Sequence, residues 1–169
     1  MDYCYIRFTI ASAEAMTAFC ALFDKIKVEK QSGTLQPEPK WKSHFADHQL
    51  STFWEPSSDE LAAWQREWQA SPVPARFTDP RLRTPWDFDS MIEAIQNGEY
   101  DLIGIRQTAN GQAQLEFQPL AYPFGGTESL QALIESFGHK IVGFEDGTGY
   151  LERAAEISPG WPEYWKTIK

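Results

Sequence analysis

The chain has 169 residues, of which 42% are hydrophobic and 14% aromatic, and its formal net charge is −9 at pH 7. A chain of this length can bury a sizeable core, so we expect a single domain over residues 1–169 that folds without a disulfide, a structural metal or a cofactor. The negative charge repels nucleic acid phosphates and anionic membranes, which excludes both as favoured partners and leaves cationic molecules.

The N-terminal segment and the cysteines bear on where the protein works. Its first four residues, Met-Asp-Tyr-Cys, lack the positive charges and the apolar run of a secretory signal, and no later run is long and apolar enough to span a bilayer. Two cysteines, Cys4 and Cys20, fall in an expected strand and an expected helix, where we expect buried, structural thiols. These features favour the cytoplasm.

The first thirty residues predict a strand, a helix and a second strand. Residues 3–10 are rich in β-branched and aromatic side chains, which indicates a strand. Ser12 can then cap a helix whose apolar face begins with Met16 and Phe19. Residues 25–30 alternate charged and apolar side chains, a pattern typical of a strand with one wet face. The opening is therefore predicted to be β-α-β.

Residues 36–85 read as an irregular insertion, because prolines interrupt them repeatedly. One short helix is predicted after Ser57, which lies three residues before Glu60 at capping-box spacing. A longer helix is predicted to start at Thr84, with Pro85 at its first helical position, and to end at Gly98.

The second half predicts the order β-β-α-β. Strands at residues 100–107 and 112–118 flank Asn110-Gly111, a pair that suits a tight hairpin turn. A helix ending at Gly138 and a strand at residues 140–144 follow. Together the halves predict an α+β fold with a ferredoxin-like β-α-β-β-α-β sheet, an extra strand from the hairpin, helices on one face, and the insertion between the halves.

A glycine pair precedes the predicted helix at residues 128–137. Backbone amides at a helix N-terminus attract anions, so Gly125, Gly126 and Thr127 form a candidate anion-binding site. The segment has neither the lysine of a P-loop nor the three glycines of a dinucleotide fingerprint. We therefore favour a turn in which the glycines take angles closed to other residues and Thr127 caps the helix.

A candidate divalent-metal site consists of His44, Asp47 and His48. Histidines four apart share one side of a helix, and a nearby carboxylate adds a third ligand. The residue after His44 is Phe45, where a zinc peptidase needs its catalytic glutamate. A metal-assisted hydrolase or a small-ligand-binding protein centred on these residues is one of two hypotheses for the function.

The other hypothesis is a non-catalytic module that binds a basic protein. Aromatic rings provide desolvated contact area and carboxylates steer a cationic partner toward it. In charge and size the chain resembles small bacterial antidote or immunity proteins that neutralise basic toxins, an analogy that no motif carries. Core packing is the alternative role for the rings. The candidate binding residues are tryptophans of the insertion and of the tail: Trp41, Trp54, Trp64, Trp68, Trp161 and Trp165.

Overall fold

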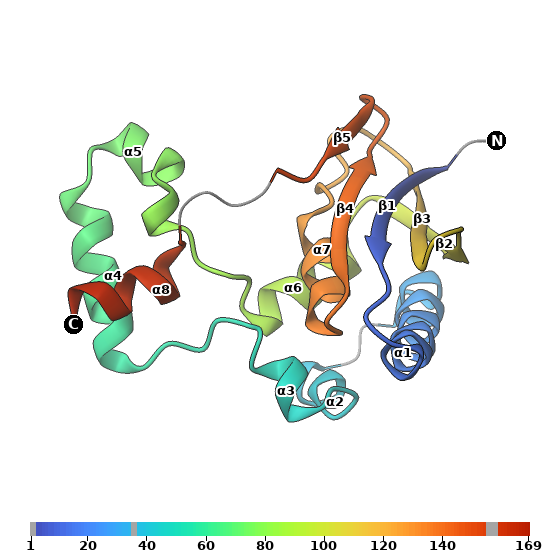
Figure 1. Cartoon of the computed structure of the whole chain (residues 1–169), viewed down its shortest axis with the longest axis horizontal. Helices are drawn as coiled ribbons and strands as arrows, with labels where there is room; N and C mark the ends of the chain where they lie inside the picture. Colours follow the sequence, from blue (N-terminus) through green and yellow to red (C-terminus); the bar gives the residue numbers. More distant parts are fainter. Residues whose placement is uncertain (1–2, 35–36, 155–158) are drawn as a thin grey trace.

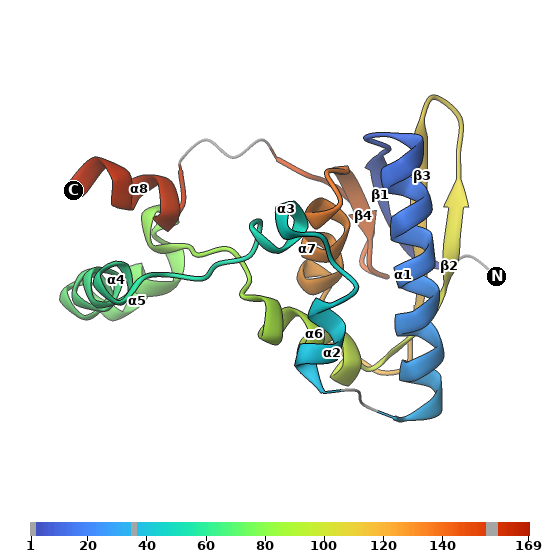
Figure 2. The ribbon, with the colours of Figure 1, turned by 90° about the horizontal axis from the view of Figure 1, so that it is seen from below.

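The structure is a computed structural model that describes residues 3–34, 37–154 and 159–169 (Figure 1). These residues form two lobes joined by a narrow waist (Figures 1 and 2). We call residues 3–53 and 88–154 the sheet lobe, and residues 54–87 and 159–169 the small lobe. The elements in chain order are β1 (Cys4–Thr9), α1 (Ala13–Ser32), α2 (Glu38–Lys42), α3 (Asp47–Leu50), α4 (Ser58–Ala70), α5 (Val73–Thr78), the 3-10 helix η1 (Pro80–Leu82), α6 (Phe88–Asn97), β2 (Tyr100–Gln107), β3 (Gln112–Pro119), α7 (Glu128–Ser136), β4 (Lys140–Glu145), β5 (Tyr150–Glu152) and α8 (Trp161–Ile168).

The sheet lobe is built on a five-stranded antiparallel sheet in the order β2-β3-β1-β4-β5. Ile6 pairs with Leu115 and Phe8 with Ala113, and these side chains are fully buried on one face. The sheet therefore has a covered face that forms the core, and the predicted α+β class is confirmed. The edge strand β5 lies toward the small lobe and β2 lies farthest from it (Figure 1).

Three helices supply much of the rest of this core. α1 contacts β2, α7 contacts β4, and α6 packs on α7. The side chain of Ser12 caps α1 by accepting a hydrogen bond from the amide of Ala15, as predicted. Within the described ranges, no helix combines the length and the apolar character needed to cross a bilayer.

The predicted strand at residues 25–30 is wrong, because these residues continue α1. Ile26 follows Phe19, Leu22 and Phe23 at helical spacing, and all four side chains are buried in the core. Val28, which the alternating pattern had placed on the buried face, is 63% exposed. Residues 25–30 are helical because Ile26 continues the buried apolar face of α1. The opening is therefore β-α, and the fifth strand is β5.

The hairpin and three further helices follow the sequence prediction, whereas α2, α3, α5, η1, β5 and α8 have no predicted counterpart. Asn110 and Gly111 have φ angles of 63° and 69°, as the predicted hairpin turn requires. The short helix predicted after Ser57 is present as α4, and the helix predicted to end at Gly138 is present as α7. The helix predicted from Thr84 starts later, at Phe88, because the carboxylate of Asp87 caps it by accepting from the amide of Ser90.

The predicted insertion is divided between the two lobes. Trp41, Phe45 and Phe53 belong to the core of the sheet lobe, where the rings of Phe45 and Phe53 pack edge-on against Phe88. Residues 54–85 instead form most of the small lobe, whose own core contains Ala63, Leu82 and Trp161. The tail thus completes this second core through α8.

Candidate functional site

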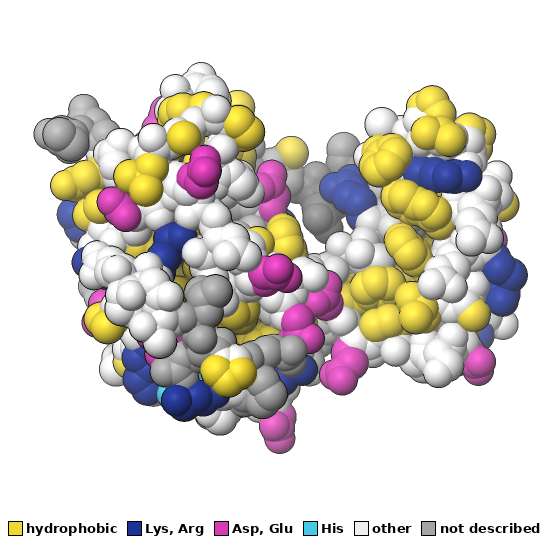
Figure 3. Space-filling model, turned by 180° about the vertical axis from the view of Figure 1, so that it is seen from behind, with side chains coloured by type: hydrophobic (Ala, Val, Ile, Leu, Met, Phe, Trp, Pro, Cys, Tyr) yellow, Lys and Arg dark blue, Asp and Glu magenta, His cyan; other side chains and the backbone are white. Residues whose placement is uncertain are grey.

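A cleft of about 900 Å³ separates the sheet lobe from the small lobe. We call it the inter-lobe cleft. One wall comes from the small lobe, with Pro80, Arg83 and Pro162, and the other comes from α7 and the β4-β5 edge of the sheet. The space-filling view shows the hollow between the two lobes (Figure 3). The cleft is thus a consequence of two separate cores joined by a narrow waist.

Apolar side chains line part of the inter-lobe cleft. Phe53 and Trp86 come from the segments that join the lobes, whereas Phe144 and Leu151 come from β4 and β5. Leu151 is 50% exposed on the edge strand β5. These side chains offer apolar contact area to a partner that enters the cleft.

Glutamates are the most frequent charged residues of the cleft. The arginines there are Arg83 and Arg153, and the guanidinium of Arg153 lies 2.8 Å from Gln131 Oε1 and 3.3 Å from Glu135 Oε1. These contacts hold the Arg153 side chain against α7. The glutamates are Glu128, Glu135, Glu152 and Glu163, so the lining carries an excess of negative charge.

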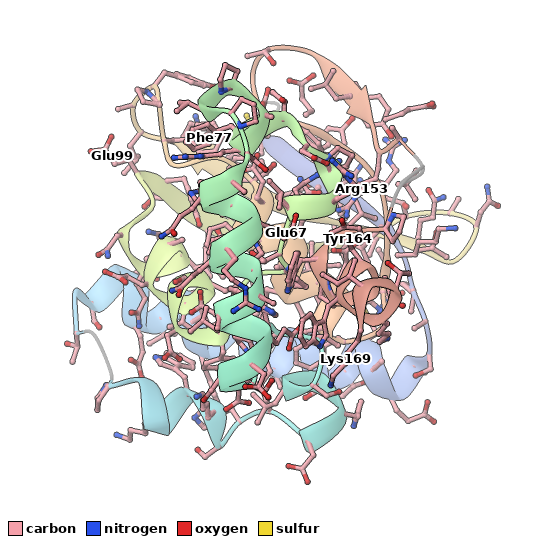
Figure 4. The ribbon with its side chains drawn as sticks, turned by 90° about the vertical axis from the view of Figure 1, so that its left-hand side faces the viewer. Glu67, Phe77, Glu99, Arg153, Tyr164 and Lys169 are labelled. Atoms are coloured by element: carbon pink, nitrogen blue, oxygen red, sulfur yellow. The ribbon has the colours of Figure 1, made fainter. Side chains whose placement is uncertain are left out.

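The small lobe also carries a row of aromatic rings. The rings of Trp54, Trp64, Trp68 and Phe77 are neighbours in that order, with centroid separations of 5.6, 5.2 and 5.4 Å. The indole N–H of Trp64 donates to the carbonyl of Leu82 and fixes the row to η1. Phe77, at the end of the row, is 77% exposed, and apolar atoms show along this lobe (Figures 3 and 4).

The predicted tryptophans do not form one surface. Trp41 is buried in the core of the sheet lobe and Trp161 in the core of the small lobe. The other four, Trp54, Trp64, Trp68 and Trp165, are half-buried around Trp161. None of the six lines the inter-lobe cleft, whereas Trp86, which was not among the predicted binding residues, does.

The predicted metal ligands lie on different local structures. His44 is in the turn after α2, while Asp47 and His48 are in the short helix α3, so the two histidines do not share a helical face. The Nδ1 atom of His44 instead accepts a hydrogen bond from the Lys25 ammonium at 3.4 Å. Among the residues described, no group of three or more His, Cys, Asp or Glu side chains is placed to hold a metal ion.

The glycine pair before α7 forms a turn. Gly125 and Gly126 have φ angles of 100° and 79°, which favour glycine. The carboxylate of Glu128 occupies the space beside Gly126, where a Cβ would have to lie. The hydroxyl of Thr127 makes no capping hydrogen bond and instead accepts from the side chain of Gln131. A carboxylate of the chain therefore lies beside the glycine pair, and anion binding by Gly125, Gly126 and Thr127 stays a prediction.

Both cysteines are free thiols. Burial raises the pKa of Cys4 and, together with the nearby Asp24 carboxylate, that of Cys20. A raised pKa lowers the fraction of reactive thiolate, which agrees with the structural role expected for both residues.

Comparison of the chain with known protein families, curated proteins and solved structures gave no match. An assignment of function must therefore come from the chemistry of the cleft and of the surfaces around it.

Proposed function

We propose that the protein is a non-catalytic module that binds a basic partner protein in the inter-lobe cleft. The observation that carries this proposal is the combination of apolar walls with an excess of glutamates in one cleft. Apolar side chains that lose water on contact supply binding energy, and surrounding carboxylates select and steer a cationic partner. A cleft of this shape suits a projecting loop or helix of the partner.

The distribution of charge supports the same partner. The sequence of the sheet lobe and its adjoining segments, residues 1–53 and 88–158, contains 17 acidic and nine basic residues, whereas the small lobe contains seven and six. Nearly all of the excess negative charge thus belongs to the sheet lobe and its adjoining segments. A basic protein would be attracted to the sheet lobe and would meet the apolar side chains of the cleft on arrival.

We also infer that the sheet lobe is a variant of the ferredoxin-like arrangement. The order β2-β3-β1-β4, with α1 between β1 and β2 and α7 between β3 and β4, supports this inference. In this view β5 extends one edge, and the segment containing α2 to α6 is inserted between α1 and β2. The arrangement accommodates many functions, so it adds nothing to the choice of partner.

The proposal is tested by affinity capture from a lysate of the source cells, followed by titration of the purified captured protein. The double variant Glu152→Lys and Glu163→Lys reverses two charges of the cleft. We expect the wild type to retain a basic protein in a salt-dependent manner and the double variant to bind it at least about tenfold more weakly.

The matched control is Glu99→Lys with Asp101→Lys, which changes the net charge equally at the beginning of β2, on the opposite edge of the sheet. This control should bind the partner within about threefold of the wild type, because local rather than total charge is proposed to matter. Equal losses in both double variants, or retention of no basic protein, would contradict the proposal.

A further inference from the structure

Apolar side chains of α4 and α5 form one face of the small lobe. Leu61, Trp64 and Trp68 follow one another at i, i+3 and i+7 in α4, so they share one side of that helix. The ring of Phe77, from α5, packs edge-on against Trp68 with a centroid separation of 5.4 Å. Val73 lies one helical turn before Phe77. We call these five residues the α4–α5 face.

The α4–α5 face leaves much apolar surface in water. Phe77 and Val73 are 77% and 61% exposed, Leu61 is also exposed, and the two tryptophans are half-buried. Apolar side chains gather along the small lobe in the space-filling view (Figure 3). Single exposed apolar residues are common on proteins, but a patch of them marks a surface that another molecule covers.

The border of this face carries little free charge. By their spacing, Ser58, Gln65 and Gln69 lie along one side of it on α4, and all three are exposed, uncharged polar residues. The guanidinium of Arg76 donates to the carbonyls of Gln69 and Ser71 at 3.1 and 3.0 Å, so backbone acceptors already hold this charge. Covering the face therefore costs little desolvation of charge, as in the core of a protein interface.

A second copy of the chain is the occupant that this face fits best. A two-fold interface brings the same patch of both subunits together, so the patch must be complementary to itself. An apolar face with an uncharged border meets this condition because it brings no like charges into contact. Glu67 lies on the side of α4 toward Tyr164, not toward Phe77 (Figure 4).

The position of the face in the molecule supports the same occupant. The seven acidic and six basic residues of the small lobe nearly cancel, although the whole chain carries a net charge of −9. α4 and α5 lie at the end of the molecule opposite β2 (Figures 1 and 2). Contact between two small lobes therefore keeps the acidic sheet lobes of both copies apart.

We propose that the protein forms a two-fold homodimer through the α4–α5 face. Val73 and Phe77 of each copy cover Leu61, Trp64 and Trp68 of the other. These residues are distinct from those that line the inter-lobe cleft, so the dimer does not depend on the protein-binding function proposed for that cleft.

The dimer is expected to be weak. A contact between two short helices of each copy lies near the lower end of specific interfaces in area, so we expect a Kd between about 5 and 100 µM. At about 1 µM the chain is then mainly a monomer, in which these side chains stay exposed.

The test is sedimentation of the untagged full chain at concentrations from about 1 to 500 µM. The mass should rise from that of one 19.3 kDa chain toward twice that value. Raising the salt concentration about tenfold should leave the Kd within about threefold or lower it, because salt screens the repulsion between two acidic chains and does not weaken an apolar contact. A chain that stays monomeric at about 500 µM, or a dimer that salt dissociates, overturns the proposal.

The variant Val73→Asp and its matched control Val28→Asp locate the interface. The two valines are 61% and 63% exposed and both lie in helices, so each substitution removes a similar apolar surface and adds the same charge. Val73→Asp should weaken the dimer at least about tenfold because it places a carboxylate in the apolar contact, whereas Val28→Asp should stay within about threefold of the wild type. Equal Kd values for the two variants, with native circular dichroism spectra, would also overturn the proposal.

Discussion

At the scale of single residues, protonation of the buried side chain of His139 should destabilise the core. Its side chain is 3% exposed, and its ring lies against the rings of Phe8 and Phe19. Its Nδ1 accepts a hydrogen bond from the amide of Ala11 at 3.1 Å, so the neutral ring carries its proton on Nε2. Burial lowers the pKa of His139 below its ordinary value of 6.5. Protonation would both break the bond to Ala11 and place a charge among phenyl rings.

Acid should therefore destabilise the fold through His139. Since the pKa is lower in the folded than in the unfolded chain, the unfolded chain binds more protons, and the free energy of unfolding falls as the pH drops below about 6.5. Urea unfolding at several pH values between 8 and about 5 measures this slope. His139→Asn should have a smaller slope, whereas His48→Asn, at an exposed position, should retain it. An unchanged slope in His139→Asn would contradict the assignment.

Lys30 joins α1 to the end of α6. Its ammonium donates to the carbonyls of Gln96 at 3.1 Å and Gly98 at 2.5 Å, and it lies 4.7 Å from the centre of the Tyr100 ring. Burial lowers the pKa of Lys30, so part of this stabilisation is offset by desolvation of the ammonium. We expect Lys30→Met to lower the free energy of unfolding by about 1–2 kcal/mol, measured by urea unfolding.

The comparison for this prediction is Lys140→Met, which removes an exposed ammonium from β4. That substitution should change the free energy of unfolding by no more than about 0.5 kcal/mol. If the two variants are equally stable, the hydrogen bonds of Lys30 to the end of α6 contribute nothing measurable.

At the scale of elements, local sequence predicts strands β1 to β4 and helices α1, α4, α6 and α7, but it ends α1 too early and does not predict α2, α3, α5, η1, β5 or α8. Ser12, Ser57 and the Asn110-Gly111 pair fix a helix start or a turn through their own chemistry, so each can be read without the rest of the chain. Residues 25–30 alternate over too few positions to outweigh the apolar helical face that precedes them. The strand predicted for residues 25–30 is wrong because the buried face of the whole helix α1, and not the short local alternation, determines which of these side chains are buried.

The attachment of α8 to η1 depends on the close approach of the Gly160 backbone to the carbonyl of Arg83. The amide of Trp161 donates to the carbonyl of Arg83 at 2.6 Å, and a Cβ on residue 160 would lie 2.8 Å from that same oxygen. Gly160→Ala should therefore push α8 from η1 and lower stability by about 1–3 kcal/mol. Thermal unfolding followed by tryptophan fluorescence reports the loss.

Gly104→Ala is the control for Gly160→Ala, because a Cβ on residue 104 would meet no atom within 4 Å. It should leave the unfolding temperature close to that of the wild type. A similar change in both variants would mean that the contact between residue 160 and Arg83 is not what holds α8.

At the scale of the whole molecule, the cleft could not have been read from the sequence. Its lining comes from segments as distant as Phe53, Trp86, Glu135 and Leu151, and no spacing pattern links them. The tryptophans drew attention because they are rare and large, yet they mainly build the two cores. Net charge is a property of composition, so the expectation of a basic partner could be formed without the fold, whereas the cleft that is proposed to hold this partner could not.

The two cores also predict unequal stability of the lobes. The small lobe buries only Ala63, Leu82 and Trp161 fully, and a unit this small has little apolar surface with which to resist opening. In native-state hydrogen exchange, α4 and α8 should therefore lose protection before β1 and β3.

Trp161→Ala should remove about 3–5 kcal/mol from the small lobe and expose these two helices, while the sheet keeps most of its protection. Phe77→Ala, at an exposed ring, should leave the order and extent of protection nearly unchanged. If Trp161→Ala instead lowers protection equally in both lobes, the two cores unfold as one cooperative unit and the cleft is rigid on that timescale.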